Sequence, residues 1–144
     1  MVRNALIIAL VVAIAAGGYY WYQDKDTRYA RQVMDCMYAG SFEPIKDTLN
    51  AEMQKAMGDP RMKAQFSQAG PKLKQYYGEI GKMEFKSKGP VEGPFAQVFS
   101  KDTTQKTWTA TSDKGTFEVT LYMDKDGKLL TMIPGPLTPL KASK

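Results

Sequence analysis

The chain has 144 residues, of which 43% are hydrophobic and 24% are charged, enough for one small folded domain. It contains no histidine, which excludes imidazole catalysis, His-ligated zinc or haem and histidine-based pH sensing. Its single cysteine excludes an intrachain disulfide framework and a multi-cysteine metal site. The formal net charge is +5. We therefore expect no metal and no other cofactor.

The N-terminal residues form an uncharged apolar run behind a short tail that contains Arg3. One interpretation is a cleaved secretory signal, with an A-x-A cleavage site at residues 13–15. The other is a retained signal anchor over residues 1–23, because an 18-residue helix spans about 27 Å, just enough for a bilayer core. We favour the anchor, since aromatic residues at one end of such a run are typical of the headgroup region. These predicted membrane-interface residues are Tyr19, Tyr20, Trp21 and Tyr22.

Small residues recur at every fourth position within this run, which would place them along one face of a helix. The predicted membrane-helix packing residues are Ala5, Ala9, Ala13 and Gly17. Such a ridge lets membrane helices approach closely, although alanine is also common in bacterial signal sequences. The pattern predicts membrane lipid and other transmembrane subunits as partners. The short tail favours an N-in orientation, hence a single-pass bacterial inner-membrane protein with its C-terminal domain in the periplasm or outside the cell.

The next segment, up to about residue 78, has the apolar spacing of helices. Residues 27–39 form the first predicted helix, with Gly40 as its stop, and Pro44 suits the start of a second helix over about 44–57. Asp59 and Pro60 begin a third helix, which we expect to break at Gly70-Pro71 before a further turn or two.

From Lys82 onward the hydrophobic period changes to two, as in strands. Residues 82–88 alternate charged and apolar side chains, and residues 106–112 and 116–123 are rich in threonine and aromatic residues. Tight turns at 113–115 and 124–127 favour an antiparallel meander. We therefore predict an α+β domain over residues 24–133, with helices packed on a curved antiparallel sheet of four to five strands. A Pro-rich tail, 134–144, follows it as either a frayed end or a strap over a partner.

Two stretches carry a resemblance to a known superfamily. Residues 37–42 (MYAGSF) and 117–129 (FEVTLYMDKDGKL) resemble uncharacterised bacterial domains with the cystatin-like α+β fold of the nuclear-transport-factor-two-like superfamily. The resemblance covers about residues 27–133. It implies a curved sheet that wraps a long helix and forms a cone, which serves as a ligand pocket, an active site or plain core. Enzymes of the superfamily generally use Asp, His or Tyr in the cone, and this chain has no histidine.

Few residues suggest chemistry. Cys36 is predicted to be a buried structural thiol. The sequence from Asp124 to Gly127 opens like a calcium loop, but position 12 of that loop would be Gly135, so we predict a hairpin turn. The lysines are scattered, which is typical of a solvated surface, and no nucleic acid is expected as a partner. Aromatic residues are usually core, yet three are candidates to line a pocket: Tyr76, Tyr77 and Trp108.

Two functions remain open, and neither is catalytic, because no nucleophile–base spacing is present. The first is an accessory or structural subunit of a larger bacterial membrane complex, such as a respiratory or photosynthetic assembly. The alternative is a free-standing membrane-anchored binding module, which uses the cone for a small apolar or anionic ligand.

Overall fold

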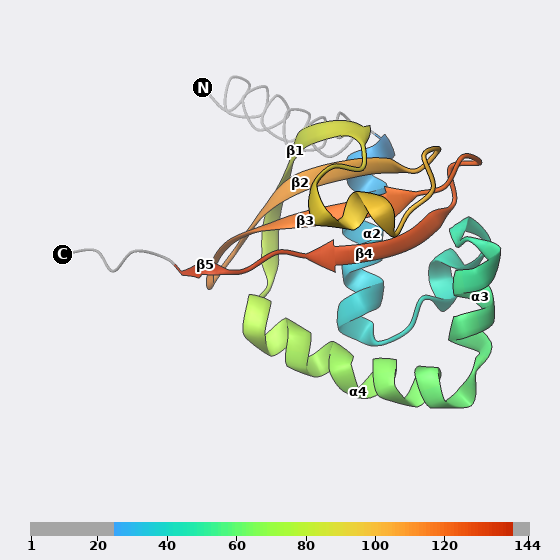
Figure 1. The fold of residues 1–144 in the computed structure, drawn as a ribbon. Helices are drawn as coiled ribbons and strands as arrows, with labels where there is room; N and C mark the ends of the chain where they lie inside the picture. Colours follow the sequence, from blue (N-terminus) through green and yellow to red (C-terminus); the bar gives the residue numbers. More distant parts are fainter. Residues whose placement is uncertain (1–24, 140–144) are drawn as a thin grey trace, which may run out of the picture.

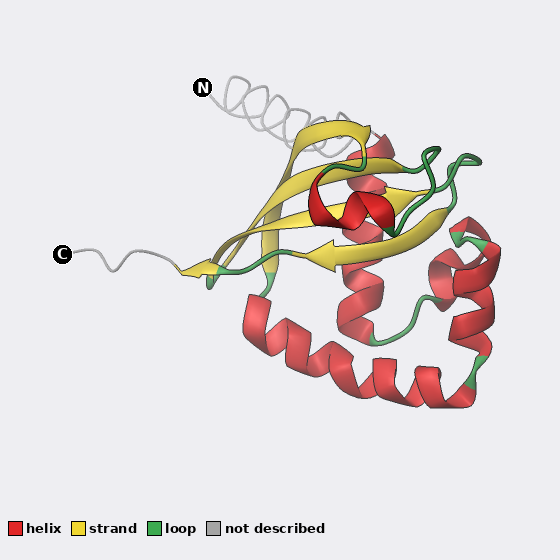
Figure 2. Ribbon diagram, in the orientation of Figure 1, coloured by secondary structure: helices red, strands yellow, loops and turns green. Residues whose placement is uncertain are grey.

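The structure, a computed structural model, describes residues 25–139 and forms an α+β fold of helices followed by an antiparallel sheet (Figures 1 and 2). The elements before the sheet are α2 (Lys25–Ala39), η1 (Glu43–Thr48), α3 (Ala51–Gly58) and α4 (Pro60–Tyr77). The elements that follow are β1 (Ile80–Pro90), η2 (Gly93–Gln97), β2 (Thr104–Ser112), β3 (Gly115–Met123), β4 (Leu129–Pro134) and β5 (Thr138–Pro139).

The predicted membrane anchor requires a correction. No helix within residues 25–139 is long and apolar enough to cross a membrane. The longest, α4, has 18 residues but carries two charged side chains in its first turn. This finding overturns the prediction of a transmembrane helix and, with it, the predicted single-pass inner-membrane location. The segment on which it was made, 1–23, lies outside the described residues, as do the predicted helix-packing residues (Ala5, Ala9, Ala13, Gly17) and interface residues (Tyr19, Tyr20, Trp21, Tyr22).

The predicted second helix is two elements. Leu49 and Asn50 separate η1 from α3, because these two residues pair with the start of β4: Leu49 bridges Leu129, and the Asn50 amide donates to the Leu129 carbonyl at 2.8 Å. Asn50 then caps α3, its side-chain oxygen accepting from the amide of Glu52 at 2.9 Å. Pairing with the sheet therefore overrides the helical pattern of this segment.

The predicted break at Gly70-Pro71 is wrong, since α4 continues through both residues (Figure 1). A proline inside a helix removes one backbone hydrogen bond. Gly70, which has no side chain, allows the two backbones to approach closely, because a Cβ there would lie 2.7 Å from the Tyr38 carbonyl and 2.8 Å from the Gly40 nitrogen. The backbone of α4 thus rests directly on the C-terminal end of α2, which ends at Gly40 with a φ of +74°, as predicted.

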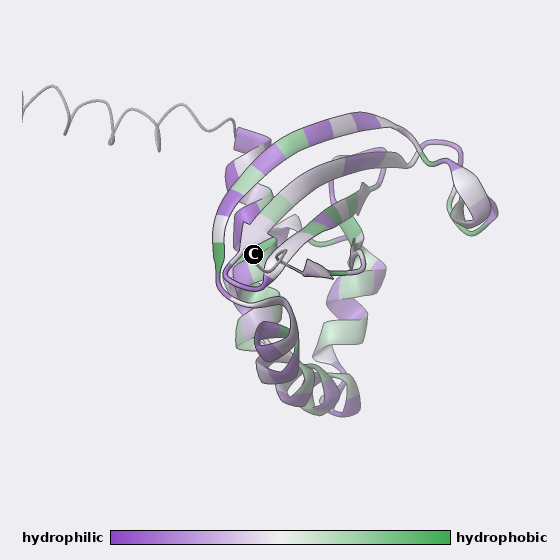
Figure 3. Cartoon of the chain, turned by 90° about the vertical axis from the view of Figure 1, so that its left-hand side faces the viewer, coloured by the Kyte–Doolittle hydropathy of each residue, from purple (hydrophilic) through white to green (hydrophobic). Residues whose placement is uncertain are grey.

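The sheet has strand order β1-β2-β3-β4 with antiparallel neighbours, and β5 pairs with the first residues of β3. β1 forms one edge, and hydrophilic and hydrophobic residues alternate along it (Figure 3). The sheet curves over α2 (Figure 3). The space between them is filled by side chains that are at most 2% exposed: Val33, Met34, Leu49, Trp108, Val119, Leu121 and Leu129. Within residues 25–139, this filled core leaves no cone-shaped cavity between the sheet and α2, and the two pockets described below lie at the margins of α2.

Candidate functional site

The predicted pocket residues are mostly part of this core. Trp108 is fully buried, and its indole nitrogen donates to the Thr27 hydroxyl at 3.0 Å. Tyr77 is 7% exposed and donates to the Gly135 carbonyl at 2.9 Å, whereas Tyr76 is 55% exposed. Tyr76 and Tyr77 touch edge to face, with ring centroids 4.8 Å apart. None of the three lines either of the two pockets that flank α2.

The first of these, here called the basic pocket, opens where the first turns of α2 meet the ends of the strands. Its volume is about 590 Å³, within the range of small-molecule sites. Three cationic side chains and one carboxylate line it, together with the apolar Met123 and the aromatic Tyr29. The charged lining residues are Lys25, Asp26, Arg28 and Lys106.

The charges of the basic pocket are not balanced. The Lys106 ammonium lies 3.2 Å from the Asp26 carboxylate, and the Lys106 side chain is only 16% exposed because the strand β2 carries it toward α2. Within residues 25–139, neither Lys25 nor Arg28 has an ion-pair partner, and both are exposed. Among the lining residues that the structure describes, three cations against one anion give a net charge of +2. An anion entering the pocket is therefore electrostatically favoured.

A hydrogen bond closes the inner wall of the basic pocket. The Tyr29 hydroxyl lies 2.7 Å from that of Thr48, which in turn donates to the Ile45 carbonyl at 2.6 Å. Burial raises the pKa of Tyr29 above its ordinary value, and the Thr48 hydrogen bond opposes that rise. Tyr29 therefore remains a neutral hydroxyl, which links α2 to η1 and fixes the pocket wall.

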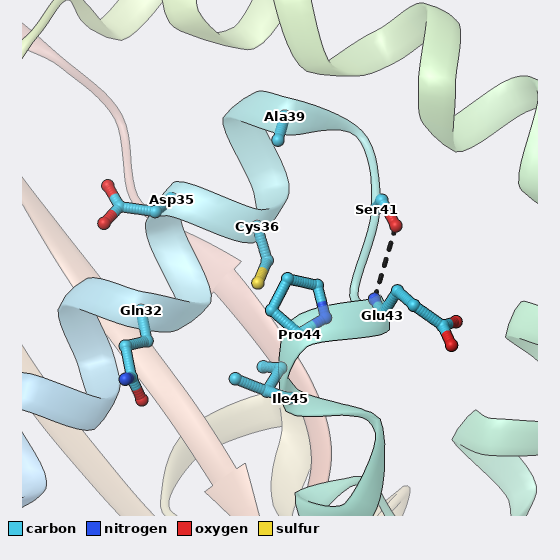
Figure 4. A pocket seen from close by; sticks show the side chains of 8 residues that line it. All are labelled: Gln32, Asp35, Cys36, Ala39, Ser41, Glu43, Pro44 and Ile45. Atoms are coloured by element: carbon cyan, nitrogen blue, oxygen red, sulfur yellow. Dashed lines mark hydrogen bonds between the residues drawn. The ribbon is translucent and has the colours of Figure 1, made fainter.

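The second pocket, here called the acidic pocket, lies between the C-terminal half of α2 and the start of η1 (Figure 4). Its volume is about 570 Å³. The sulfur of Cys36 points toward Pro44 and Ile45 at its centre, while the carboxylates of Asp35 and Glu43 point outward to opposite sides (Figure 4). No basic residue lines it. The remaining lining residues are Gln32, Ala39 and Ser41.

Cys36 does not supply a reactive thiolate. It is 5% exposed, as the sequence predicts for a structural thiol. Burial raises the pKa of the Cys36 thiol, and the negative charge of Asp35 raises it further. A protonated thiol is a weak nucleophile and a weak metal ligand. The residue therefore acts as part of the apolar floor of the acidic pocket.

The predicted hairpin turn at residues 124–127 is present and is closed by its own side chain. The Asp124 carboxylate accepts the backbone amides of Asp126 and Lys128, each at 2.9 Å, and the Asn50 side-chain amide at 2.6 Å. Within residues 25–139, no group of three or more carboxylate or thiol side chains could hold a metal ion. Asp124 thus has a structural role in joining the turn to the cap of α3.

The charged residues of both pockets were not predicted from the sequence. Arg28, Gln32 and Asp35 lie at positions i, i+4 and i+7, which places them on one face of a helix. That spacing was the available signal, since a polar stripe that changes from positive to negative is visible in the sequence alone. Searches for similar proteins add no assignment, because no family model, curated protein or solved structure matches this chain. The superfamily resemblance stays a prediction.

Proposed function

We propose that this domain is a non-catalytic binding module that takes a small amphiphilic anion in the basic pocket. The observation that carries the proposal is an excess of cations around a cavity large enough for a ligand. The cations are Lys25, Arg28 and Lys106, and the single anion is Asp26. The apolar wall of Met123 and the ring of Tyr29 offer a surface for a hydrocarbon portion. A ligand with a carboxylate or phosphate head and a short apolar stem fits this combination.

The predicted role as an accessory subunit has no support among the described residues. Its main basis, besides the lack of a catalytic constellation, was a ridge of small residues in a segment that lies outside residues 25–139. The binding-module function rests instead on a cavity whose wall, charge and hydrogen bonds are defined. The site differs from the predicted cone in one respect, because core side chains fill the space under the sheet and the pocket lies at its margin.

Isothermal titration with octanoate and octyl phosphate tests this proposal, with octanol as the uncharged probe. We expect both anions to bind more tightly than octanol and to lose affinity as salt is raised, because salt screens charges near the surface. Arg28→Gln should weaken octanoate binding about tenfold, as expected for one charge-assisted hydrogen bond. Arg61→Gln is the matched control, since Arg61 is exposed on α4 and lies outside the pocket. Equal binding of octanoate and octanol, or equal effects of the two variants, would contradict the proposal.

A further inference from the structure

The basic and acidic pockets adjoin along the outer face of α2, because Gln32 lines both. We propose that together they form one groove that binds a short peptide with two free termini. Its carboxylate occupies the basic pocket, and its ammonium lies at the acidic pocket, beside Asp35. This inference rests on the proposed function and gives the anionic ligand a second, positively charged end.

The spacing of the charged side chains sets the length of the peptide. Arg28 and Asp35 are seven residues apart on α2, which corresponds to about 10 Å along the helix axis. An extended chain advances by about 3.3 to 3.6 Å per residue. A peptide of about three residues therefore places its two termini beside Arg28 and Asp35. A longer peptide would have to leave the groove at one end.

The acidic end of the groove favours a cation for two independent reasons. Asp35 and Glu43 carry two negative charges, and no lining residue of the acidic pocket is basic. In addition, the last turn of α2 contains no basic residue. The C-terminal end of a helix carries a partial negative charge, which favours cations and disfavours carboxylates such as Asp35. An ammonium group beside Asp35 would interact favourably with that carboxylate and with the helix end, while Glu43 adds to the negative potential from the opposite side of the pocket.

The middle of the groove suits a peptide better than a plain hydrocarbon. Gln32 is exposed, and its amide offers both donors and an acceptor, which matches a peptide group. The floor beside it is apolar, formed by Cys36, Pro44 and Ile45 (Figure 4). An apolar side chain in the centre of the peptide would lie on this floor. The preferred ligand is therefore a tripeptide with free ends and an apolar middle residue.

Titrations with three forms of one tripeptide test the inference. The probes are alanyl-leucyl-alanine with free termini, its N-acetylated form and its C-terminal amide. We expect N-acetylation and Asp35→Asn each to weaken binding about tenfold, and the variant to have no further effect on the acetylated peptide, because both changes remove the same charge pair. Asp102→Asn is the matched control, since this exposed aspartate lies outside both pockets. Circular dichroism of each variant verifies that it is folded.

The outcomes separate this inference from the proposed function. Suppose the acetylated and free peptides bind equally, and both lose affinity in Arg28→Gln: the peptide groove is then overturned, while the anion pocket stands. If amidation and Arg28→Gln have no effect on peptide binding, the groove is overturned, and the octanoate titration decides separately whether the anion pocket stands. The groove is supported if acetylation and amidation each weaken binding, if Asp35→Asn removes the effect of acetylation, and if Arg28→Gln removes the effect of amidation.

Discussion

The two faces of α2 differ in what each contributes to the protein. The inner face packs beneath the sheet, and Ala30, Val33 and Met34 are at most 1% exposed. The outer face carries Arg28 and Asp35, which are exposed and change the sign of the charge from one end to the other. Burial of the inner face holds the helix in place, and the outer face contributes little to stability. Stability and binding are therefore separable by substitutions within a single helix.

The largest expected effect tests the inner face. Met34→Ala should lower the free energy of unfolding by about 2–5 kcal/mol, because it removes apolar contacts and leaves a cavity in the core. Gln32→Ala, two residues away on the outer face, should change it by less than about 0.5 kcal/mol. Urea denaturation followed by circular dichroism measures both. Similar losses of unfolding free energy for the two variants would show that the two faces of α2 contribute equally to stability.

The next effect tests the close backbone contact between Gly70 of α4 and the C-terminal end of α2. Gly70→Ala should destabilise the protein by about 1–3 kcal/mol, because the added Cβ would meet backbone atoms of α2 that cannot rotate away. Gly58→Ala is the matched control, since a Cβ at Gly58 would have no neighbour within 4 Å. There, alanine should be neutral or stabilise by up to about 1 kcal/mol. Thermal unfolding compares the two variants, and a stable Gly70→Ala protein would refute the close contact.

A smaller effect sharpens the contrast between stability and binding on the outer face. Asp35→Lys should stabilise the fold by about 0.3–1 kcal/mol at low salt, because it replaces an anion near the C-terminal end of α2 by a cation. The same variant should lose recognition of a peptide ammonium. Gln32→Lys, in the middle of the helix, should leave stability nearly unchanged. Finding that Asp35→Lys is less stable than the parent protein would show that Asp35 has a structural role.

The smallest effect concerns the pH dependence of Cys36, which lies between the two faces. Because burial and the charge of Asp35 raise its pKa in the folded protein, the neutral thiol favours folding. This contribution is present at neutral pH and is lost as the pH rises from about 9 through the folded-state pKa. Cys36→Ala should therefore lose less stability than the parent protein between neutral and alkaline pH. Melting curves of both proteins at both pH values measure the difference. The contribution of the buried tyrosines cancels in this comparison, because both proteins contain them.

The element order was predictable from the sequence because periodicity and turn residues act locally. The switch to a period of two near Lys82, the stop at Gly40 and the turn at Asp124 all have counterparts in the structure. The two failures within the described helices depend on distant partners. Leu49 pairs with Leu129, and Gly70 meets the end of α2, and neither contact leaves a signal in the sequence around it.

The site was less predictable than the fold, for a related reason. Tyr77 and Trp108 were candidates because of residue type alone, whereas burial and hydrogen bonds assign them to the core. The basic pocket joins α2 with Lys106, a residue about 80 positions later, and that meeting depends on the register of the whole sheet. Only the stripe from Arg28 to Asp35 was accessible from spacing, since it lies within one helix.

The edge strand β1 has a consequence for the behaviour of concentrated solutions. An open strand edge exposes backbone groups that can pair with another chain. β1 is 11 residues long and carries three lysines against one glutamate: Lys82, Lys86, Lys88 and Glu84. Lys82 is paired with Glu84 and Lys86 with Glu118, which leaves the strand with a net positive charge. Two copies that met edge to edge would bring two such positive edges together, so mutual repulsion opposes growth of the sheet from one molecule to the next. Salt screens that repulsion, and low ionic strength is therefore the condition in which the protein stays dispersed.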